Sequence, residues 1–344
     1  MTSAPPQVWS RLRATRSAPP GRATATPPRR RTYVAAMEQF EELMRAAVQV
    51  GPAARALPLF YALSQAGRAV TAAQADEPWQ LRGHGLQLKD EGRALLDRRV
   101  SPEGGPGTSY RRVAEATGSA VLQQPVTVGA LCASLPDLAA VPELCGAKPR
   151  ALFVQPIAKS GGAVLVMSRD VEAYVVNLPA AIATTEDTAS VLRDHLLDYP
   201  TVAGWALPDP PRLVPPSDGW GAATVLRWRV SEDVQSPNEP DRQARMREVA
   251  PQYRHSDQQW CRPAVAPGTL LSPLMTWWGL LYALSMVARY EPAEWAGLLS
   301  IDHSELAVPL EGVLVDALEV VPHLVLDALQ ETPLLLRPIS RYGG

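Results

Sequence analysis

Apolar residues recur at helical spacing near both ends of the chain. Between residues 32 and 50 they fall at i, i+3, i+4 and i+7, which places them on one face of a helix. These residues are Phe40, Leu43, Met44 and Ala47. We expect Thr32 to cap this helix, and we expect a second helix over residues 53–75, interrupted near Pro58 because proline lacks an amide hydrogen.

From residue 267 onward the sequence is again typical of helices. Residues 269–288 contain no charged side chain. Pro292 suits the first turn of a short helix that runs through Leu299, where its missing N–H needs no partner. Pro309 and Pro322 are expected to begin or kink two last helices.

The middle of the chain predicts strands instead of long helices. Short segments rich in β-branched and aromatic residues predict antiparallel strands. They cover residues 151–157, 163–168, 173–178 and 222–230. A helix is expected over residues 187–199, and a polar loop over residues 231–241.

One phrase occurs twice, as Tyr-Ala-Leu-Ser-x-x-x-Arg at residues 61–68 and 282–289. Serine and arginine stand at i and i+4, so they share one face of a helix. Two related helices from opposite parts of the chain are expected to pack together. This predicts an α+β protein, in which the N- and C-terminal parts form a mainly helical domain around a β-rich insert. The expected divisions are residues 1–32 (a tail), 33–150 (helical), 151–262 (the insert) and 263–344 (helical).

Charge is unevenly distributed. The first 32 residues hold seven arginines and no acid, whereas the whole chain has a net charge of −2, so the remainder carries −9. We expect a disordered basic tail rich in arginine and proline, able to contact RNA, DNA or an acidic surface. It lacks the apolar region of a secretory signal. An alternative is that Trp9 and Leu12 dock on the body as an extended strap.

The composition is that of a soluble protein. Hydrophobic residues make up 46% and charged residues 20% of the 344 positions. Residues 269–288 are long enough to span a bilayer, but they include proline, glycine and hydroxyl side chains. These residues favour a buried core helix over a membrane-spanning one, and no membrane partner is expected. The three cysteines (Cys132, Cys145 and Cys261) form no C-x-x-C pair, so we expect a cytoplasmic protein without a disulfide scaffold.

The candidate chemistry centres on the repeated phrase. Arg68 and Arg289 end apolar helices, where they would bond helix-end carbonyls or pair with Glu291 or Glu294. Alternatively, they form a pocket for an anion such as a nucleotide or RNA phosphate. The candidate ligand-binding residues are Ser64, Arg68, Arg82, His84, Ser285, Arg289, Tyr290 and Glu294.

His84 is the single candidate for a catalytic residue. It lies between Gly83 and Gly85, which would form a tight turn or let a ligand approach the backbone. No histidine pair or histidine–carboxylate cluster has metal-ligand spacing, and no phosphate-binding or dinucleotide motif occurs, so neither a metal nor a cofactor is expected. Arginines and aromatic residues alternate between residues 227 and 260, but intervening acids favour an ordinary solvated surface over a nucleic-acid site.

Three motifs in order resemble the YaaC-like family of bacteria. They are Leu57–Arg68, His84-Gly85-Leu86, and Leu284–Tyr290 followed by Pro292 and Trp295. The resemblance covers most of the chain after residue 33, and it implies no established activity. The helical organisation is also similar to that of HEPN domains, helical bundles of toxin and defence systems.

Many HEPN domains are ribonucleases with an arginine followed four to six residues later by a histidine. This chain has Trp295 where Arg289 would need that histidine. Cleavage would therefore need a composite site, with Arg68 and Arg289 holding phosphate and His84 as the acid or base.

Two functions are consistent with these residues. The first is a noncatalytic binding or interaction protein that holds an anionic small molecule or RNA between the twin helices, or a protein partner. The second is a HEPN-like, metal-independent ribonuclease with a degenerate motif. The sequence specifies neither the ligand nor the oligomeric state.

Overall fold

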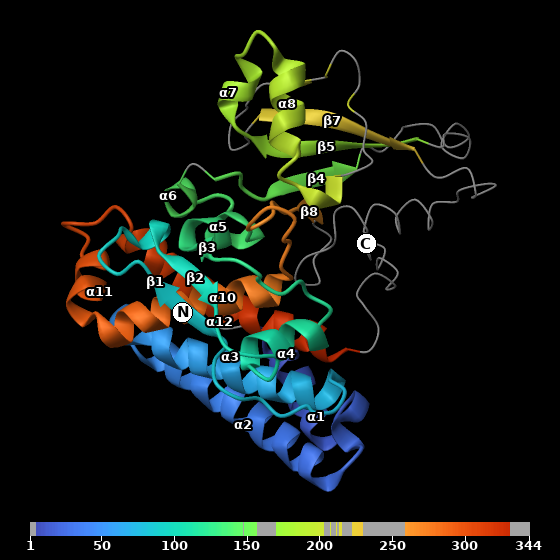
Figure 1. Ribbon diagram of the computed structural model, residues 1–344, viewed down its shortest axis with the longest axis vertical. Coiled ribbons are helices and arrows are strands. Elements are labelled where there is room, and N and C mark those ends of the chain that lie inside the picture. The colour runs from blue at the N-terminus through green and yellow to red at the C-terminus, as the bar shows by residue number, and fades with distance from the viewer. Residues whose placement is uncertain are drawn as a thin grey trace. The chain divides into compact units, whose positions relative to one another are not determined.

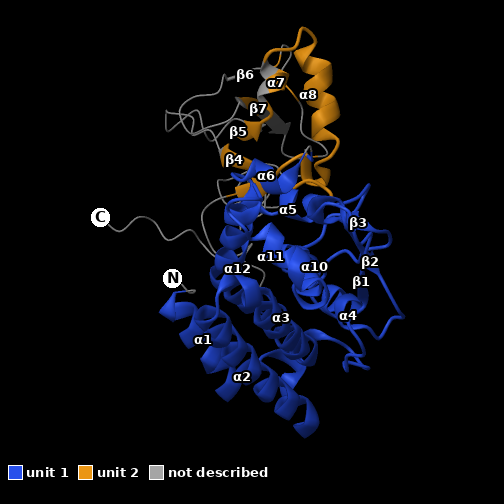
Figure 2. Ribbon diagram, turned by 90° about the vertical axis from the view of Figure 1, so that its left-hand side faces the viewer, with its two compact units in different colours: residues 1–148, 265–331 blue, residues 149–264, 332–344 orange. Residues whose placement is uncertain are grey.

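The structure, a computed structural model, describes residues 5–146, 148–156, 170–202, 207, 211, 213–214, 222–229 and 259–330. Residues 1–148 and 265–331 form one compact unit, and residues 149–264 form the body of a second (Figure 2). The predicted strand over residues 163–168, the polar loop over residues 231–241 and most of the basic and aromatic segment before Gln259 lie outside the described residues.

The first unit is mainly helical (Figure 1). Its helices are α1 Pro6–Ser17, α2 Pro27–Gln49, α3 Pro52–Gln74, α4 Ser109–Ala116, α5 Val128–Ala133, α6 Pro142–Cys145, α10 Pro273–Tyr290, α11 Pro292–Leu298 and α12 Ala307–Leu329. Helix α3 packs against α2, α4, α10 and α12, and so stands at the centre of this unit. The prediction that both chain ends build one helical domain is confirmed.

Helix α10 is buried on nearly every side. Trp277 and Trp278 are at most 1% exposed, and most other side chains of the helix are also buried. The interpretation of residues 269–288 as a core helix is therefore confirmed. Among the described residues, no helix combines the length and the apolar character that a membrane crossing requires.

Three predicted helix boundaries are wrong. Helix α2 begins at Pro27 after Thr26, and not at Thr32. Helix α3 continues through Pro58, and α12 is one helix through Pro322 and not two. Each internal proline removes one backbone hydrogen bond, but most of the stability of a protein helix comes from packing, and Leu59 and Val321 beside the two prolines are buried.

The prediction of a disordered tail is also wrong for residues 5–32, the part of it that the structure describes. Residues 6–17 form α1, which buries Val8 and Leu12 at i and i+4 against α2 and α12. Arg29, only 3% exposed, donates from Nε to the carbonyl of Ala72 near the end of α3, at 2.7 Å. The apolar pair and the arginine contacts supply the packing that composition alone does not reveal.

A small antiparallel sheet in the first unit was not predicted. Its order is β1-β2-β3, with β1 Leu86–Lys89, β2 Arg99–Pro102 and β3 Val126–Thr127. Leu86 pairs with Pro102, and Arg99 with Thr127. Strands of two to four residues are too short to show an alternating pattern in the sequence.

The second unit contains a five-stranded antiparallel sheet of order β6-β7-β5-β4-β8. Its strands are β4 Leu152–Pro156, β5 Asp170–Leu178, β6 Leu213–Val214, β7 Ala222–Arg229 and β8 Gln259–Cys261. Helices α7 Ala180–Ala183 and α8 Thr188–Leu196 accompany it, and Leu192 of α8 joins Leu152 and Val175 in the core (Figure 1). The predicted strands near residues 152, 175 and 225 and the predicted α+β class are confirmed.

Candidate functional site

The twin helices α3 and α10 pack side by side in opposite directions. Gly67 of α3 lies against Trp278, the Phe60 ring is 5.5 Å from the Tyr282 ring, and Tyr61 contacts Arg289. Arg68 stands seven residues along α3 from Tyr61, which is about 10 Å at 1.5 Å per residue. The arginines of the two copies therefore do not converge.

The two helices are in direct contact along their middle. A Cβ atom on Gly67 would lie 2.5 Å from two ring atoms of Trp278 and 2.9 Å from Cγ2 of Val113. Such distances leave no room even for a methyl group. An anion that interacts with these helices must therefore reach them at an end and not between them.

Arg289 lies at such an end, with two tyrosines. Its Nη1 donates a hydrogen bond to the hydroxyl of Tyr61 at 3.0 Å, and its guanidinium carbon stands 5.1 Å from the centre of the Tyr290 ring. Tyr61 is 39% exposed and Tyr290 is 65% exposed. The guanidinium is thus positioned by aromatic side chains on the surface.

His84 belongs to the same neighbourhood. Its exposed ring lies 5.8 Å from the ring of Phe60, which is itself 6.0 Å from that of Tyr61. We call Phe60, Tyr61, His84, Arg289 and Tyr290 the Arg289 cluster. Phe60 thus connects His84 to Tyr61, which in turn contacts Arg289.

The glycines beside His84 have a structural explanation. Gly83 and Gly85 have φ angles of 60° and 86°, in the left-handed region that glycine adopts readily. A Cβ atom on Gly85 would also lie 2.6 Å from Oγ1 of Thr108. The carbonyl of His84 accepts a hydrogen bond from the amide of Tyr110 at 3.0 Å, so the turn is fastened to the start of α4.

The serines of the two copies differ in their exposure to solvent. Ser285 is fully buried and donates to the carbonyl of Tyr282 at 2.8 Å, whereas Ser64 is half-buried. Arg68 and Arg82 are both exposed, and among the described residues neither guanidinium forms a hydrogen bond or an ion pair. These residues do not join the Arg289 cluster through any described contact.

Glu291 and Glu294 are held by a residue that sequence analysis missed. The fully buried Arg98 donates from Nη1 to Glu291 at 2.6 Å and from Nη2 to Glu294 at 2.7 Å. The hydrogen bond from Arg98 lowers the pKa of Glu291 below its ordinary value. The predicted pairing of Arg289 with either glutamate is therefore wrong, because Arg98 takes both carboxylates. Arg98 stands 193 positions from Glu291, and no local pattern signals the pair.

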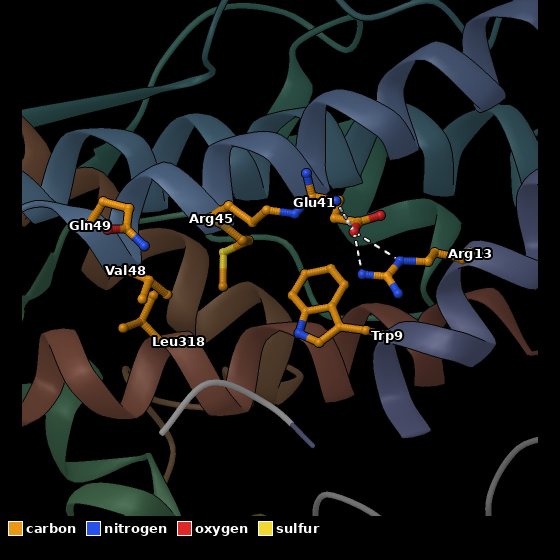
Figure 3. A pocket seen from close by; sticks show the side chains of 8 residues that line it. Trp9, Arg13, Glu41, Arg45, Val48, Gln49 and Leu318 are labelled. Atoms are coloured by element: carbon orange, nitrogen blue, oxygen red, sulfur yellow. Dashed lines mark hydrogen bonds and ion pairs between the residues drawn. The ribbon is translucent and has the colours of Figure 1, made fainter. Parts of the chain in front are cut away.

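A cavity of about 260 Å³ lies between α1, α2 and α12 in the first unit (Figure 3). Its apolar lining consists of Trp9, Met44, Val48 and Leu318, and its polar lining of Arg13, Glu41, Arg45 and Gln49. Sequence analysis missed it because residues 9 and 13 had been assigned to a disordered tail. The amphipathic pairing of Val8 with Leu12 was the signal that could have revealed α1.

Glu41 is the ionic centre of this cavity. Its carboxylate is only 5% exposed and accepts hydrogen bonds from Nε and Nη2 of Arg13 at 2.9 and 2.7 Å. It also pairs with Arg45, and with Arg16 at 3.5 Å. Burial raises the pKa of Glu41, but the hydrogen bonds from Arg13 and Arg45 outweigh it, so the net pKa is lowered and the group is ionised at neutral pH.

Comparison with known proteins gives one match. The family model described as YaaC-like Protein matches residues 14–329. The chain belongs to the YaaC-like family. The family match includes both copies of the repeated phrase, all of the Arg289 cluster, and Glu41 and Arg45 of the cavity, whereas Trp9 and Arg13 precede it. No curated protein and no solved structure matches this YaaC-like chain significantly.

The likeness of this YaaC-like chain to HEPN domains stays a prediction. Within the described parts of the chain, no three histidine, cysteine, aspartate or glutamate side chains come close enough together to hold a metal ion.

Proposed function

We propose that this YaaC-like protein is a noncatalytic binding protein that engages an anionic group, such as the phosphate of a nucleotide or RNA, at the Arg289 cluster. The supporting observation is the division of charge beside α10. Arg98 takes the carboxylates of Glu291 and Glu294, while Arg289 is exposed and its guanidinium contacts only Tyr61 and Tyr290 among the described residues.

The surroundings of Arg289 suit an anion with an attached planar group. The guanidinium uses Nη1 for Tyr61, and within the described residues its remaining N–H groups have no acceptor, so they can donate to phosphate oxygens. The exposed ring of Tyr290 offers a surface on which a base can stack. The hydrogen bond to Tyr61 and the contact with the Tyr290 ring orient the guanidinium, which reduces the entropy lost when a ligand binds.

The setting of His84 favours binding over cleavage. A catalytic histidine is usually oriented by a hydrogen bond to one ring nitrogen. Among the described residues the His84 ring has aromatic neighbours, Phe60 and Tyr282, and no hydrogen-bond partner. The one observation that supports the alternative, a HEPN-like metal-independent ribonuclease, is that the rings of Phe60 and Tyr61 link His84 to Arg289.

The test is the binding of a short fluorescein-labelled oligouridine, followed by fluorescence anisotropy. Loss of a charge-assisted hydrogen bond costs about 1.5–3 kcal/mol, so we expect Arg289→Gln to weaken binding roughly ten- to a hundredfold. Arg68→Gln is the matched control, since Arg68 occupies the same position in the other copy, and we expect it to bind like the wild type. Unchanged affinity of Arg289→Gln, or equal losses in both variants, would overturn the proposal.

The same RNA separates binding from cleavage. Incubated with the protein in the presence of EDTA and analysed by gel electrophoresis, it should stay intact. Cleavage by the wild type that disappears in His84→Ala would contradict the noncatalytic proposal and support the ribonuclease.

A further inference from the structure

The cavity between α1, α2 and α12 has two chemically different ends. Its apolar part is lined by Met44 and Val48 of α2, by Leu318 of α12 and by the indole of Trp9. Trp9 is fixed by packing, since its ring stands 5.5 Å from that of Phe40. The other end presents Arg13 and Arg45 around Glu41 (Figure 3).

The charges at the polar end do not balance. Three arginines (Arg13, Arg16 and Arg45) share the single carboxylate of Glu41. Among the described residues none of the three has another carboxylate partner, so the cluster carries two surplus positive charges.

The surplus guanidiniums keep donors that Glu41 does not use. Arg13 donates to Glu41 from Nε and Nη2, and Arg45 from Nη2. Within the described residues, Nη1 of Arg13 and both Nε and Nη1 of Arg45 have no partner. Arg13 and Arg45 are 51% and 66% exposed, so a ligand can reach them from solvent.

We infer that this cavity binds a small amphipathic organic anion, with an apolar body against Trp9, Met44 and Leu318 and a carboxylate against Arg13 and Arg45. Apolar walls with a few convergent polar groups are the usual composition of a small-molecule site. Guanidinium groups match the geometry of a carboxylate. Because Glu41 already occupies one side of each arginine, the ligand carboxylate completes an alternating arrangement of charges.

This inference is independent of the Arg289 cluster. It uses α1, α2 and α12, whereas the proposed function uses the ends of α3 and α10. Either can fail without the other.

Isothermal titration calorimetry with three eight-carbon probes tests the inference on the full chain. Octanoate, octanol and octylamine share one apolar body and differ in the charge of the head group. We expect octanoate to bind at least tenfold more tightly than octanol, because charge-assisted hydrogen bonds contribute about 1.5–3 kcal/mol. Octylamine should not bind. Equal affinities for the three probes, or no binding of octanoate, would overturn the inference.

Two variants locate the site. Arg45→Gln, at an exposed side chain, should reduce the affinity for octanoate about tenfold and leave that for octanol unchanged. Val48→Trp should fill the apolar part and abolish binding of both probes. Arg31→Gln, an exposed arginine on the same helix that does not line the cavity, is the matched control and should bind as the wild type does. An equal loss in Arg31→Gln and Arg45→Gln would show nonspecific attraction to the basic surface and contradict the assignment.

Discussion

Tyr61 and Tyr282 occupy the same position in the two copies of the repeated phrase, yet their surroundings are opposite. Tyr282 is 5% exposed and donates to the carbonyl of Leu86 at 2.7 Å, which joins α10 to β1. Tyr61 is 39% exposed and accepts from Arg289 at the surface. The same residue type thus has a structural role in one copy and an accessible position in the other.

The two arginines of the repeated phrase also differ in their contacts. Arg289 is held by Tyr61 and Tyr290, whereas Arg68 has no side-chain partner among the described residues. The repeated phrase therefore encodes two helices that pack together, and the neighbours of each copy decide what its polar residues do. Three pairs of substitutions test which contacts of these helices stabilise the fold.

The largest effect is expected for Glu291→Ala, which removes the carboxylate that binds the buried Arg98 through both oxygens. Leaving a buried charge without its main partner costs about 3 kcal/mol, so the free energy of unfolding in urea should fall by that amount. Glu294→Ala is the matched control and should cost less, because Glu294 makes a single contact with Arg98. If Glu294→Ala were the more costly variant, the assignment of Glu291 as the main partner would be wrong.

The same pair predicts a dependence on pH. The pKa of Glu291 is lowered in the folded protein, so its stabilisation is complete above the ordinary glutamate pKa of 4.5 and is lost as the pH falls below it. In urea unfolding between pH 7 and 3, the free energy of unfolding of the wild type should fall. The free energy of unfolding of Glu291→Ala should fall by less over the same range. Parallel profiles for the two proteins would contradict this linkage.

A second substitution tests the contact between the twin helices. Gly67→Ala places a methyl group 2.5 Å from the buried Trp278 ring, and we expect it to lower the free energy of unfolding by about 2 kcal/mol. Gly312 of α12 is the matched control, because a Cβ atom there meets nothing within 4 Å. Gly312→Ala should instead stabilise the protein by about 0.5–1 kcal/mol, and equal effects at both sites would refute the close packing at Gly67.

The smallest effect compares the two tyrosines directly. Tyr282→Phe leaves the buried carbonyl of Leu86 without its donor and should cost about 1 kcal/mol in thermal or urea unfolding. Tyr61→Phe removes a bond at the surface and should change stability by less than about 0.5 kcal/mol. Equal costs in the two variants would remove the distinction between the copies.

Sequence patterns predicted the long elements well for a physical reason. Helix α2 carries several turns of apolar spacing, which indicates the face that it buries, and the uncharged sequence of α10 indicates a helix buried on nearly every side. The patterns failed where packing outweighs local preference, as at Pro58 and Pro322. They also failed for α1, because the abundance of arginine and proline in residues 1–32 indicated disorder, although Val8 and Leu12 are buried.

The candidate site was only partly predictable. The phrase drew attention to Arg289, Tyr290 and His84, which the structure places near Tyr61 and Phe60. The role of Arg98 and the grouping of three arginines around Glu41 depend on residues distant in the chain, and spacing within one segment cannot reveal them.

The packing of α3 against α10 and α12 has a consequence for synthesis on the ribosome. Helix α3 is among the first elements to be made, whereas α10 and α12 follow only after residues 149–264 have been translated. At roughly 10 residues per second, the side of α3 that packs against α10 and α12 waits about twenty seconds or longer for these two partners. A nascent chain that stops before residue 273 therefore lacks Trp278 and Tyr282, against which Phe60 packs, and chaperones have a defined interval in which to protect this side of α3.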